Sequence, residues 1–372
     1  MKSNEINRRR FFGKVAVASA CIATLSFMPV FGNTGDTGDT ADKSSVLSND
    51  NDPLGPIRDV ETTAKLLPEF PKFEYRGIVL GYENLKHLPH NDLCQVSVFP
   101  AYKYLDQPLG KYYAYYSSHD GPGGICLAYA DDLEGPWTEC DSSPLFTNEW
   151  EPHYKVSHIS GPDAIWIEKE KKVFVYYHGE NQDTRFASSS DGIHFEYEGV
   201  AASLRDHGFS SLSYARVANF TMPGHSIRYI MLCWGVDKSA GMVYLATSVD
   251  GRTWAPSTTP LIPLPPGTGV GGPACYLRWD NRNFIITMGN LKSVNNWWEP
   301  ISNIYLYELD ELLQNPKFQG VLLDRGVLAP EHQRFSTPCI FEEDEKIHMF
   351  FSVGKRLNEK MGYAVADKGI IK

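Results

Sequence analysis

Residues 157–179, SHISGPDAIWIEKEKKVFVYYHG, carry the pattern that decides the fold. The first part predicts a buried strand in which one aspartate, Asp163, lies among apolar and small residues. A charged turn follows at Glu168–Lys172, and then a second strand ends at His178 and Gly179. Because a carboxylate inside a strand core is costly unless water, a partner or a ligand compensates it, we expect Asp163 to open onto a cavity.

The composition fits a large domain built from short strands. The chain has 372 residues, of which 42% are hydrophobic and 13% aromatic, so it can bury a sizeable core. Twenty tyrosines, nineteen phenylalanines, 31 glycines and 24 prolines favour many strands joined by turns. The net charge of −10 argues against a nucleic acid as the main partner, although local arginines can still hold a small anion.

The N-terminus has the pattern of an export signal. Three arginines, Arg8–Arg10, precede an uncharged apolar stretch, Val15–Gly32, and this resembles a twin-arginine-type signal peptide over residues 1–32. The protein is therefore expected in the periplasm or outside the cell. The alternatives are a retained membrane anchor, which Pro29 disfavours, and a lipid anchor at Cys21. Residues 33–55 are polar and predict a disordered linker, so that residues 56–372 form the folded domain.

Six cysteines follow the predicted signal, and their spacing shows no CxxC motif or Cys/His cluster. A structural zinc site is therefore not expected. A domain of this size does not need a disulfide framework. Cys94, Cys275 and Cys339 fall in predicted inner strands, where we expect them to be small core residues.

A pattern of strands and turns returns five times along the chain. In each unit a first strand, an aromatic-rich second strand and a third strand follow one another, and two of the turns read Ser188–Gly192 and Ser248–Gly251. In the fourth unit Leu309–Gln314 replaces this turn and predicts a helical turn. Five units of four antiparallel strands predict an all-β, five-bladed β-propeller. Phe73–Leu80 would supply the missing strand of the fifth unit, and a β-sandwich is the alternative.

Several segments of this sequence are similar to a known group of enzymes. The strand SGPDAIW followed by YYHG, the unit PLGKYYAYYSSHDGPGGICLAYADDLEGPW and the turn SSSDGIHF resemble the five-bladed propeller glycoside hydrolases around families 43, 32 and 117. The resemblance extends from about Tyr82 to Lys368. It implies an exported glycosidase, exo-acting, that cleaves a terminal sugar from a polysaccharide or an oligosaccharide by carboxylate acid/base catalysis.

The candidate site follows from the predicted propeller. The starts of the inner strands and the loops after the second strands should lie on one face around the axis. The carboxylates expected there, as catalytic candidates, are Asp92, Asp163, Glu180 and Glu331. The candidates for sugar binding are His90, Asn91, His119, Asp120, His158, His178, Arg185, Tyr214, Arg216, Trp234, Asn290 and His332. This mixture of acids, imidazoles, cations and aromatic rings is typical of a pyranose pocket.

The resemblance also implies roles for individual residues. Asp92 matches the base or nucleophile of the first blade, and Asp163 matches the aspartate that tunes the pKa values of its neighbours. The family's Glu-Gly-Pro motif, which carries the general acid, is absent, because the corresponding strand reads Tyr214-Ala215-Arg216. The acid is then Glu180, Glu331, His119 or His332, and the stereochemical outcome stays open because it depends on the spacing of the two carboxyl groups.

Arg216 has two possible roles. On an inner strand it pairs with Asp163, or it clamps a carboxylate or sulfate of the sugar together with Arg185. The second role would also suit a polysaccharide lyase, with Tyr214 or His158 as the base. A non-catalytic glycan-binding propeller is the remaining alternative. No cofactor is expected to be required, the sequence carries no metal motif, and a divalent cation at the propeller axis is left open.

Overall fold

The computed structural model describes residues 66–87, 92–203, 205, 211–237, 240–262, 268–291 and 301–369. All of them belong to one compact unit, Asp50–Lys372. The predicted signal peptide and linker lie outside the described residues. In the described ranges, no helix is long and apolar enough to cross a membrane.

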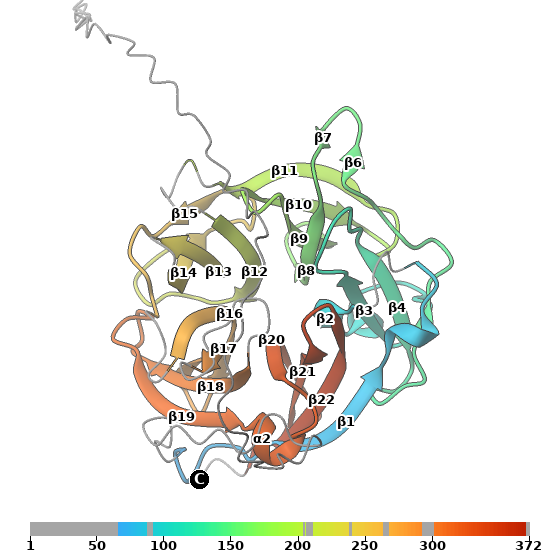
Figure 1. Ribbon diagram of the computed structural model, residues 1–372. Helices are drawn as coiled ribbons and strands as arrows, with labels where there is room; N and C mark the ends of the chain where they lie inside the picture. The colour runs from blue at the N-terminus through green and yellow to red at the C-terminus, as the bar shows by residue number, and fades with distance from the viewer. Residues whose placement is uncertain are drawn as a thin grey trace, which may run out of the picture. The chain divides into compact units, whose positions relative to one another are not determined.

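The first three blades are separate four-stranded antiparallel sheets (Figure 1). The first consists of β2 (Cys94–Phe99), β3 (Tyr112–Ser117), β4 (Cys126–Ala130) and β5 (Thr138–Glu139). The second consists of β8 (Ile159–Ile167), β9 (Lys172–Gly179), β10 (Asp183–Ser189) and β11 (Glu196–Ser203). The third consists of β12 (Ser211–Asn219), β13 (Tyr229–Asp237), β14 (Ala240–Ser248) and β15 (Trp254–Pro256).

The last two blades are joined into one eight-stranded sheet. The fourth consists of β16 (Thr268–Trp279), β17 (Arg282–Leu291), β18 (Ser302–Leu309) and β19 (Lys317–Leu323). The fifth consists of β20 (Arg334–Glu343), β21 (Lys346–Lys355), β22 (Asn358–Asp367) and the N-terminal strand β1 (Glu74–Leu80). A single parallel bridge between Ser302 and Arg334 connects the two blades.

The N-terminal strand closes the ring, as the sequence predicted. β1 pairs antiparallel with β22, and Leu80 lies opposite Met361. The fourth unit departs from its prediction, because a hydrogen-bonded turn at Asp310 and Leu313 replaces the helical turn and leads into β19 as a regular fourth strand.

The five inner strands surround a common axis. β2 contacts β8, β8 contacts β12, β12 contacts β16, β16 contacts β20, and β20 contacts β2 again. Each neighbouring pair of blades buries a hydrophobic cluster of its own, and the clusters contain Phe284 and Phe351, Leu80 and Tyr116, Tyr113 and Tyr177, Ile230 and Tyr305, and Phe174 and Met231. A ring of this kind has no place in a β-sandwich, so that alternative is wrong.

Each inner strand contains a register shift at the same place. The shifts lie between Cys94 and Ser97, Ser160 and Asp163, Ser213 and Arg216, Gly271 and Ala274, and Ser336 and Cys339. Gln95, Gly161, Tyr214 and Thr337, inside four of these bulges, have positive φ angles. Since a bulge re-aims the side chains beside it, this repeated device decides which residues face the axis.

Shorter elements connect the blades. They are η2 (Tyr82–Asn84), η3 (Ala101–Lys103), the hairpin β6 (Glu149–Trp150) and β7 (Tyr154–Lys155), and α2 (Arg325–Leu328). The Asp324 side chain caps α2 by accepting a hydrogen bond from the Gly326 N–H. The α2 turn and the five residues that follow it lead directly into β20.

Candidate functional site

Side chains from four blades lie around the axis at the end where the inner strands begin, and we call this end the mouth. They come from residues that begin an inner strand and from residues that end or follow a second strand. The mouth residues are His119, Asp120, His158, His178, Tyr214, Trp234 and Arg356. All of them are partly exposed except His178, which is buried.

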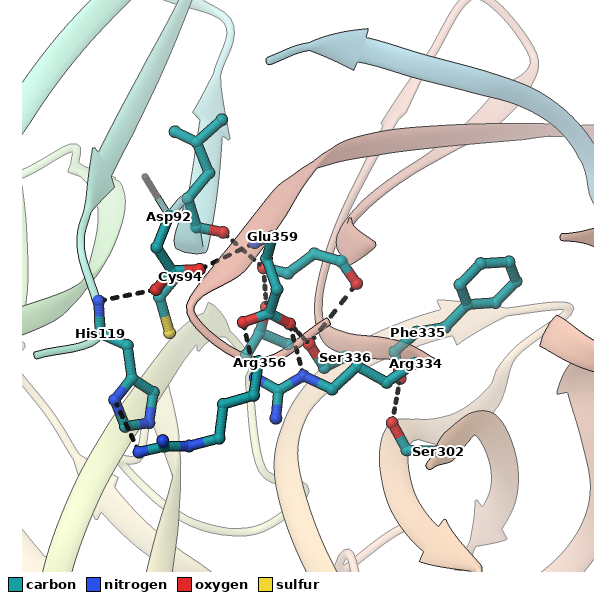
Figure 2. A network of polar contacts seen from close by, with 12 residues as sticks. Asp92, Cys94, His119, Ser302, Arg334, Phe335, Ser336, Arg356 and Glu359 are labelled. Carbon is teal, nitrogen blue, oxygen red and sulfur yellow. Dashed lines mark hydrogen bonds and ion pairs between the residues drawn. The ribbon is translucent and has the colours of Figure 1, made fainter. Parts of the chain in front are cut away.

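His119 is held in a polar group with Asp120 and Arg356. Its Nδ1 atom lies 2.7 Å from Asp120 Oδ1 and 3.4 Å from Arg356 Nη2, the second contact being drawn in Figure 2. The Arg356 Nη2 atom lies 3.7 Å from Asp120 Oδ1. Burial lowers the pKa of His119, although Asp120 opposes the shift. The imidazole is therefore mostly unprotonated at neutral pH and can accept a proton.

Beyond His119, aromatic and imidazole rings of the second and third blades line the mouth. The Tyr214 ring centroid lies 6.4 Å from that of His119, 4.8 Å from that of His178 and 5.9 Å from that of Trp234. The His158 ring is 5.9 Å from the His178 ring. Burial and the neighbouring His158 lower the pKa of His178 well below its usual range. These rings give the mouth an apolar face on which a sugar ring can stack.

Glycine is required beside these rings. At Gly161 the φ angle is +66°, and a Cβ atom would lie 2.8 Å from His178 Nδ1. At Gly241, on the strand next to Trp234, a Cβ atom would lie 2.4 Å from Trp234 Nε1. The packing of both rings therefore depends on the absence of a side chain at these positions.

Asp92 lies beneath the mouth, not at its surface. Its side chain is fully buried, and its two carboxyl oxygens accept hydrogen bonds of 3.0 Å from the backbone N–H groups of His119 and Glu359 (Figure 2). Burial and the negative charge of Glu359 raise the pKa of Asp92 to about 7. Asp92 thus ties the first blade to the fifth and supports the segment that carries His119.

An ion pair lies next to Asp92 in the same buried network. Arg334 donates two hydrogen bonds to Glu359, of 2.7 and 2.5 Å, and Ser336 Oγ donates another of 2.7 Å. Although burial opposes it, Glu359 raises the pKa of Arg334 above its usual range. The bidentate pair fixes the starts of β20 and β22 and holds a charged layer under the mouth (Figure 2).

Asp163 and Arg216 form a buried pair at the axis, the first of the two roles considered for Arg216. Arg216 Nη1 lies 2.9 Å from Asp163 Oδ1, and the other Asp163 oxygen accepts from the Val217 N–H at 2.7 Å. Burial raises the pKa of Asp163, while Arg216, the Val217 N–H and the Ser97 hydroxyl favour its ionised form.

The remaining donors of Arg216 bind backbone carbonyls of three blades. They reach Val96, Pro162, Thr337 and Pro338 at 2.9–3.4 Å. All five N–H groups of the guanidinium are then used, so Arg216 has none left for the carboxylate or sulfate of a sugar. Gln95 adds bonds to the carbonyls of Gly161 and Ala215. Together these side chains fill the axis beneath the mouth.

Glu180 and Arg185 form a second, half-buried pair at the end of β9. Arg185 Nη2 lies 3.0 Å from Glu180 Oε1 and 3.3 Å from Asp183 Oδ2. Burial raises the pKa of Glu180, although Arg185 opposes the shift. The second carboxyl oxygen of Glu180 is buried without a hydrogen-bond partner, and its backbone N–H donates to the His158 carbonyl at 3.2 Å. Glu180 is therefore a carboxyl poised to hold a proton beside the mouth.

The other predicted site residues lie further from this group or outside the described residues. Glu331 and His332 pair at 3.6 Å between α2 and β20, with Glu331 strongly exposed. Asn290 lies on β17, but its side chain is outside the described residues. His90 and Asn91 also lie outside them.

Sequence reasoning missed three charged residues of this region: Arg334, Arg356 and Glu359. Arg356 follows the second strand of the fifth blade, as His119 follows that of the first, so the rule that selected His119 also points to Arg356. Arg334 begins the inner strand β20, so the rule for inner-strand starts also covers it, whereas Glu359 lies at the start of the third strand β22, which that rule does not select. In the described part of the chain, no group of three or more His, Cys, Asp or Glu side chains is placed to hold a metal ion.

Comparisons with known proteins support the fold. No protein-family model matches the chain, and no curated protein matches its sequence. Solved structures of carbohydrate-active proteins share the fold, and three of them illustrate it. An α-L-arabinofuranosidase from Podospora anserina, in complex with cellotriose, has a TM-score of 0.55 at 11% identity and covers 81% of this chain and 98% of its own. The catalytic domain of a GH62 α-L-arabinofuranosidase from Coprinopsis cinerea has a TM-score of 0.55 at 10% identity, with 81% and 98% covered.

The third solved structure is that of an enzyme with a different reaction. An N-acetylgalactosamine deacetylase from F. plautii, in complex with blood group B trisaccharide, has a TM-score of 0.52 at 13% identity and covers 78% of this chain and 94% of its own. The chain therefore has the propeller fold that these carbohydrate-active proteins share, as the resemblance predicted. At such low identity the likeness concerns the fold, and the reaction has to be argued from the site.

Proposed function

We propose that this protein is an exported glycoside hydrolase that removes a terminal sugar from a polysaccharide or an oligosaccharide. The observation that carries the proposal is the mouth itself, where a half-buried imidazole, a carboxylate, a guanidinium and two aromatic side chains surround the axis. Acid/base groups beside a stacking face are the parts that glycoside cleavage needs. The structural neighbours that act on glycosides are consistent with it.

We assign the two proton-transfer roles from the electrostatics. His119, whose pKa is lowered by burial, is the base that activates water, and Asp120 orients its ring. Glu180, whose pKa is raised by burial, is the acid that protonates the leaving oxygen. Tyr214 and Trp234 contact the sugar ring, and Arg356 binds its hydroxyl or carboxylate groups.

The blocked axis favours an exo mode of action. Arg216 and Gln95 join the inner strands by hydrogen bonds just beneath the mouth, so a glycan that enters along the axis cannot pass through. A dead-end site of this kind suits the terminal sugar of a chain better than an internal one. We expect monosaccharides as the first products of digestion.

The test is a substrate screen with the full chain. Aryl glycosides and oligosaccharides with neutral, uronic and sulfated sugars are incubated with the protein, and the release of reducing ends is measured. His119→Gln and Glu180→Gln are each expected to lower kcat by about 10²-fold or more. Glu331→Gln, the same kind of change at an exposed residue of this end, is the matched control. Inactivity on every substrate, or equal effects of all three changes, would reject the proposal.

A polysaccharide lyase is the second candidate, and one contact favours it. Arg356 lies beside His119, so a uronate carboxylate bound to the guanidinium would bring the C5 proton near an imidazole base. The two reactions differ in their products, because elimination forms an unsaturated uronate that absorbs ultraviolet light whereas hydrolysis does not. Ultraviolet absorbance is therefore followed in the same screen. Acetate release is measured as well, because it would indicate a deacetylase.

We propose that the reaction needs no metal ion. The backbone carbonyls at the axis that could coordinate a divalent cation already accept hydrogen bonds from Arg216. Turnover is expected to be unchanged by a chelator, and a loss that Ca²⁺ or Zn²⁺ restores would contradict this.

Export is tested by fractionating cells that express the full chain and a variant with Arg9→Lys and Arg10→Lys, which is expected to stay in the cytoplasm.

A further inference from the structure

The end of the propeller opposite to the mouth contains a second hollow. Three adjoining cavities of about 400, 280 and 50 Å³ lie where the inner strands end, and they share lining residues. The two larger ones share Asn219, and the smallest shares Tyr276 with one and Asp163 with the other. We call these three cavities together the lower hollow. Arg216 separates it from the mouth.

One end of the lower hollow carries a row of aromatic rings. The Phe99 and Tyr104 rings stack with centroids 5.4 Å apart, and the Tyr104 and Trp166 rings stack at 5.2 Å. Tyr104 is 41% exposed, a large fraction for an aromatic side chain. Trp166 is held in place by the bond from its Nε1 to Glu168, of 2.7 Å. The row is fixed, with Phe99 buried, Trp166 partly buried and Tyr104 exposed, and its accessible part is a surface on which the apolar face of a sugar can pack.

The other end carries two exposed arginines, Arg228 and Arg278. The Arg228 guanidinium donates to the carbonyl of Ile227 at 2.9 Å, which limits its movement. Arg278 lies beside the Tyr276 hydroxyl, where it opposes the burial that raises the pKa of Tyr276 to about 12. Among the described residues, neither arginine forms an ion pair.

The charges of the lower hollow do not cancel. Its two acidic residues each have a cation of their own, Asp163 with Arg216 at 2.9 Å and Glu342 with Lys368 at 2.6 Å. Lys103, on the rim, pairs with Glu343 at 2.7 Å. Arg228 and Arg278 therefore leave a positive surplus in a protein whose net charge is −10. A surplus of this kind selects an anionic ligand.

We propose that the lower hollow is a second, non-catalytic glycan-binding site that takes an acidic oligosaccharide. Its sugar rings pack against Tyr104 and Trp166, and its carboxylate or sulfate groups bind Arg228 and Arg278. A flexible polysaccharide held there stays close to the protein while its free end is processed at the mouth, so binding of long chains gains from two attached sites. The inference concerns binding alone and does not depend on which reaction the mouth performs.

Calorimetry with the full chain tests the proposal. The probes are oligogalacturonate and chondroitin sulfate oligosaccharides, with a malto-oligosaccharide of the same length as the neutral comparison. The acidic probes are expected to bind, the neutral one more weakly, and added salt should weaken the acidic probes most. Tighter binding of oligogalacturonate identifies the carboxylate as the recognised group, and tighter binding of chondroitin sulfate identifies the sulfate. Absence of binding by both acidic probes would overturn the proposal.

Variants locate the site. Arg228→Ala/Arg278→Ala is expected to weaken binding of the acidic probes by about tenfold or more, since bonds between charged groups are lost. The control Arg76→Ala/Lys155→Ala removes the same charge from exposed positions outside the hollow and should change binding less than about twofold. Trp166→Ala should weaken both acidic and neutral probes.

Turnover of a short substrate separates the two sites. The arginine variant should keep the kcat/KM of the parent protein on an aryl glycoside, because its changes lie at the far end of the axis. Equal loss in the control pair, or unchanged binding in the arginine variant, would overturn the inference. A variant that unfolds is replaced by Arg228→Gln/Arg278→Gln, which keeps the polar ends. Failure of hydrolysis at the mouth would leave these binding results unaffected.

Discussion

At the scale of the residue, the two aspartates singled out by the sequence act as connectors. Asp92 accepts backbone hydrogen bonds from the first and fifth blades, and Asp163 compensates the charge of Arg216 at the axis. Both are buried, and neither lies at the mouth. The proton-transfer roles proposed here therefore fall to His119 at the mouth and to Glu180 beside it.

Asp92 predicts how stability depends on pH. Its pKa is about 7 in the folded protein against 3.8 in an unfolded chain, so the folded state holds one more proton between these values. The contribution of this proton to the free energy of unfolding is fully present at low pH. It is lost as the pH rises towards 7, and the total loss is about 4 kcal/mol. Urea unfolding at pH 5 and pH 8 should show a smaller pH difference for Asp92→Asn than for the parent. An unchanged difference in Asp92→Asn, with Asp131→Asn as control, would contradict it.

The Asp163–Arg216 pair predicts a large loss of stability on breaking one partner. Asp163→Asn leaves the guanidinium buried without a counter-charge and should lower the free energy of unfolding by about 3–5 kcal/mol. The exposed Asp106→Asn serves as the control and should change it by less than about 0.5 kcal/mol. A loss below about 1 kcal/mol in Asp163→Asn would mean that the carbonyls alone hold Arg216.

At the scale of the element, the repeated bulge decides where the inner-strand residues point. The position after the bulge is occupied by Ser97, Asp163, Arg216, Ala274 and Cys339 in the five blades. Four of these side chains meet below the mouth, whereas Ala274 packs in a hydrophobic cluster. This is why a carboxylate and a guanidinium from different blades can pair there. The bulge also gives Tyr214 its φ angle of 53° and places its ring among the mouth residues.

The closing strand predicts a contrast between two neighbouring side chains. Leu80 on β1 is 2% exposed and packs in the cluster between the first and fifth blades, whereas Ile78 is 39% exposed. Leu80→Ala should lower the free energy of unfolding by about 2–5 kcal/mol. Ile78→Ala on the same strand is the control and should cost about 0.5 kcal/mol or less. Similar losses for both, measured by thermal or urea unfolding, would argue against β1 as the closing strand.

At the scale of the whole molecule, blade-to-blade packing holds the ring without covalent links in the described ranges. The six cysteines that follow the predicted signal are free and buried: Cys94, Cys126, Cys140, Cys233, Cys275 and Cys339. Burial raises the pKa of Cys94 well above its usual range, so its thiol is unreactive. The mouth and the lower hollow, the two sites proposed here, lie at opposite ends of the axis that the ring surrounds.

The buried thiols predict that redox conditions have little effect on the native protein. A thiol reagent should label these six cysteines slowly in the folded protein and completely after unfolding in urea. A reducing agent should leave the Tm unchanged, because no disulfide is present among them to be reduced. Fast labelling in the native state, or a Tm that falls with the reducing agent, would contradict the packing described here.

The sequence by itself determined the blades, because hydrophobic alternation, aromatic second strands and turn residues are local patterns that recur in each unit. It also determined the closing strand and several of the polar residues around the mouth, since position in a repeat implies position in the ring. Only the tertiary structure decided which groups those residues contact. Arg216 turns out to be fully occupied by protein groups, and Arg356 joins His119, because contacts between blades depend on distances that no spacing in the chain encodes.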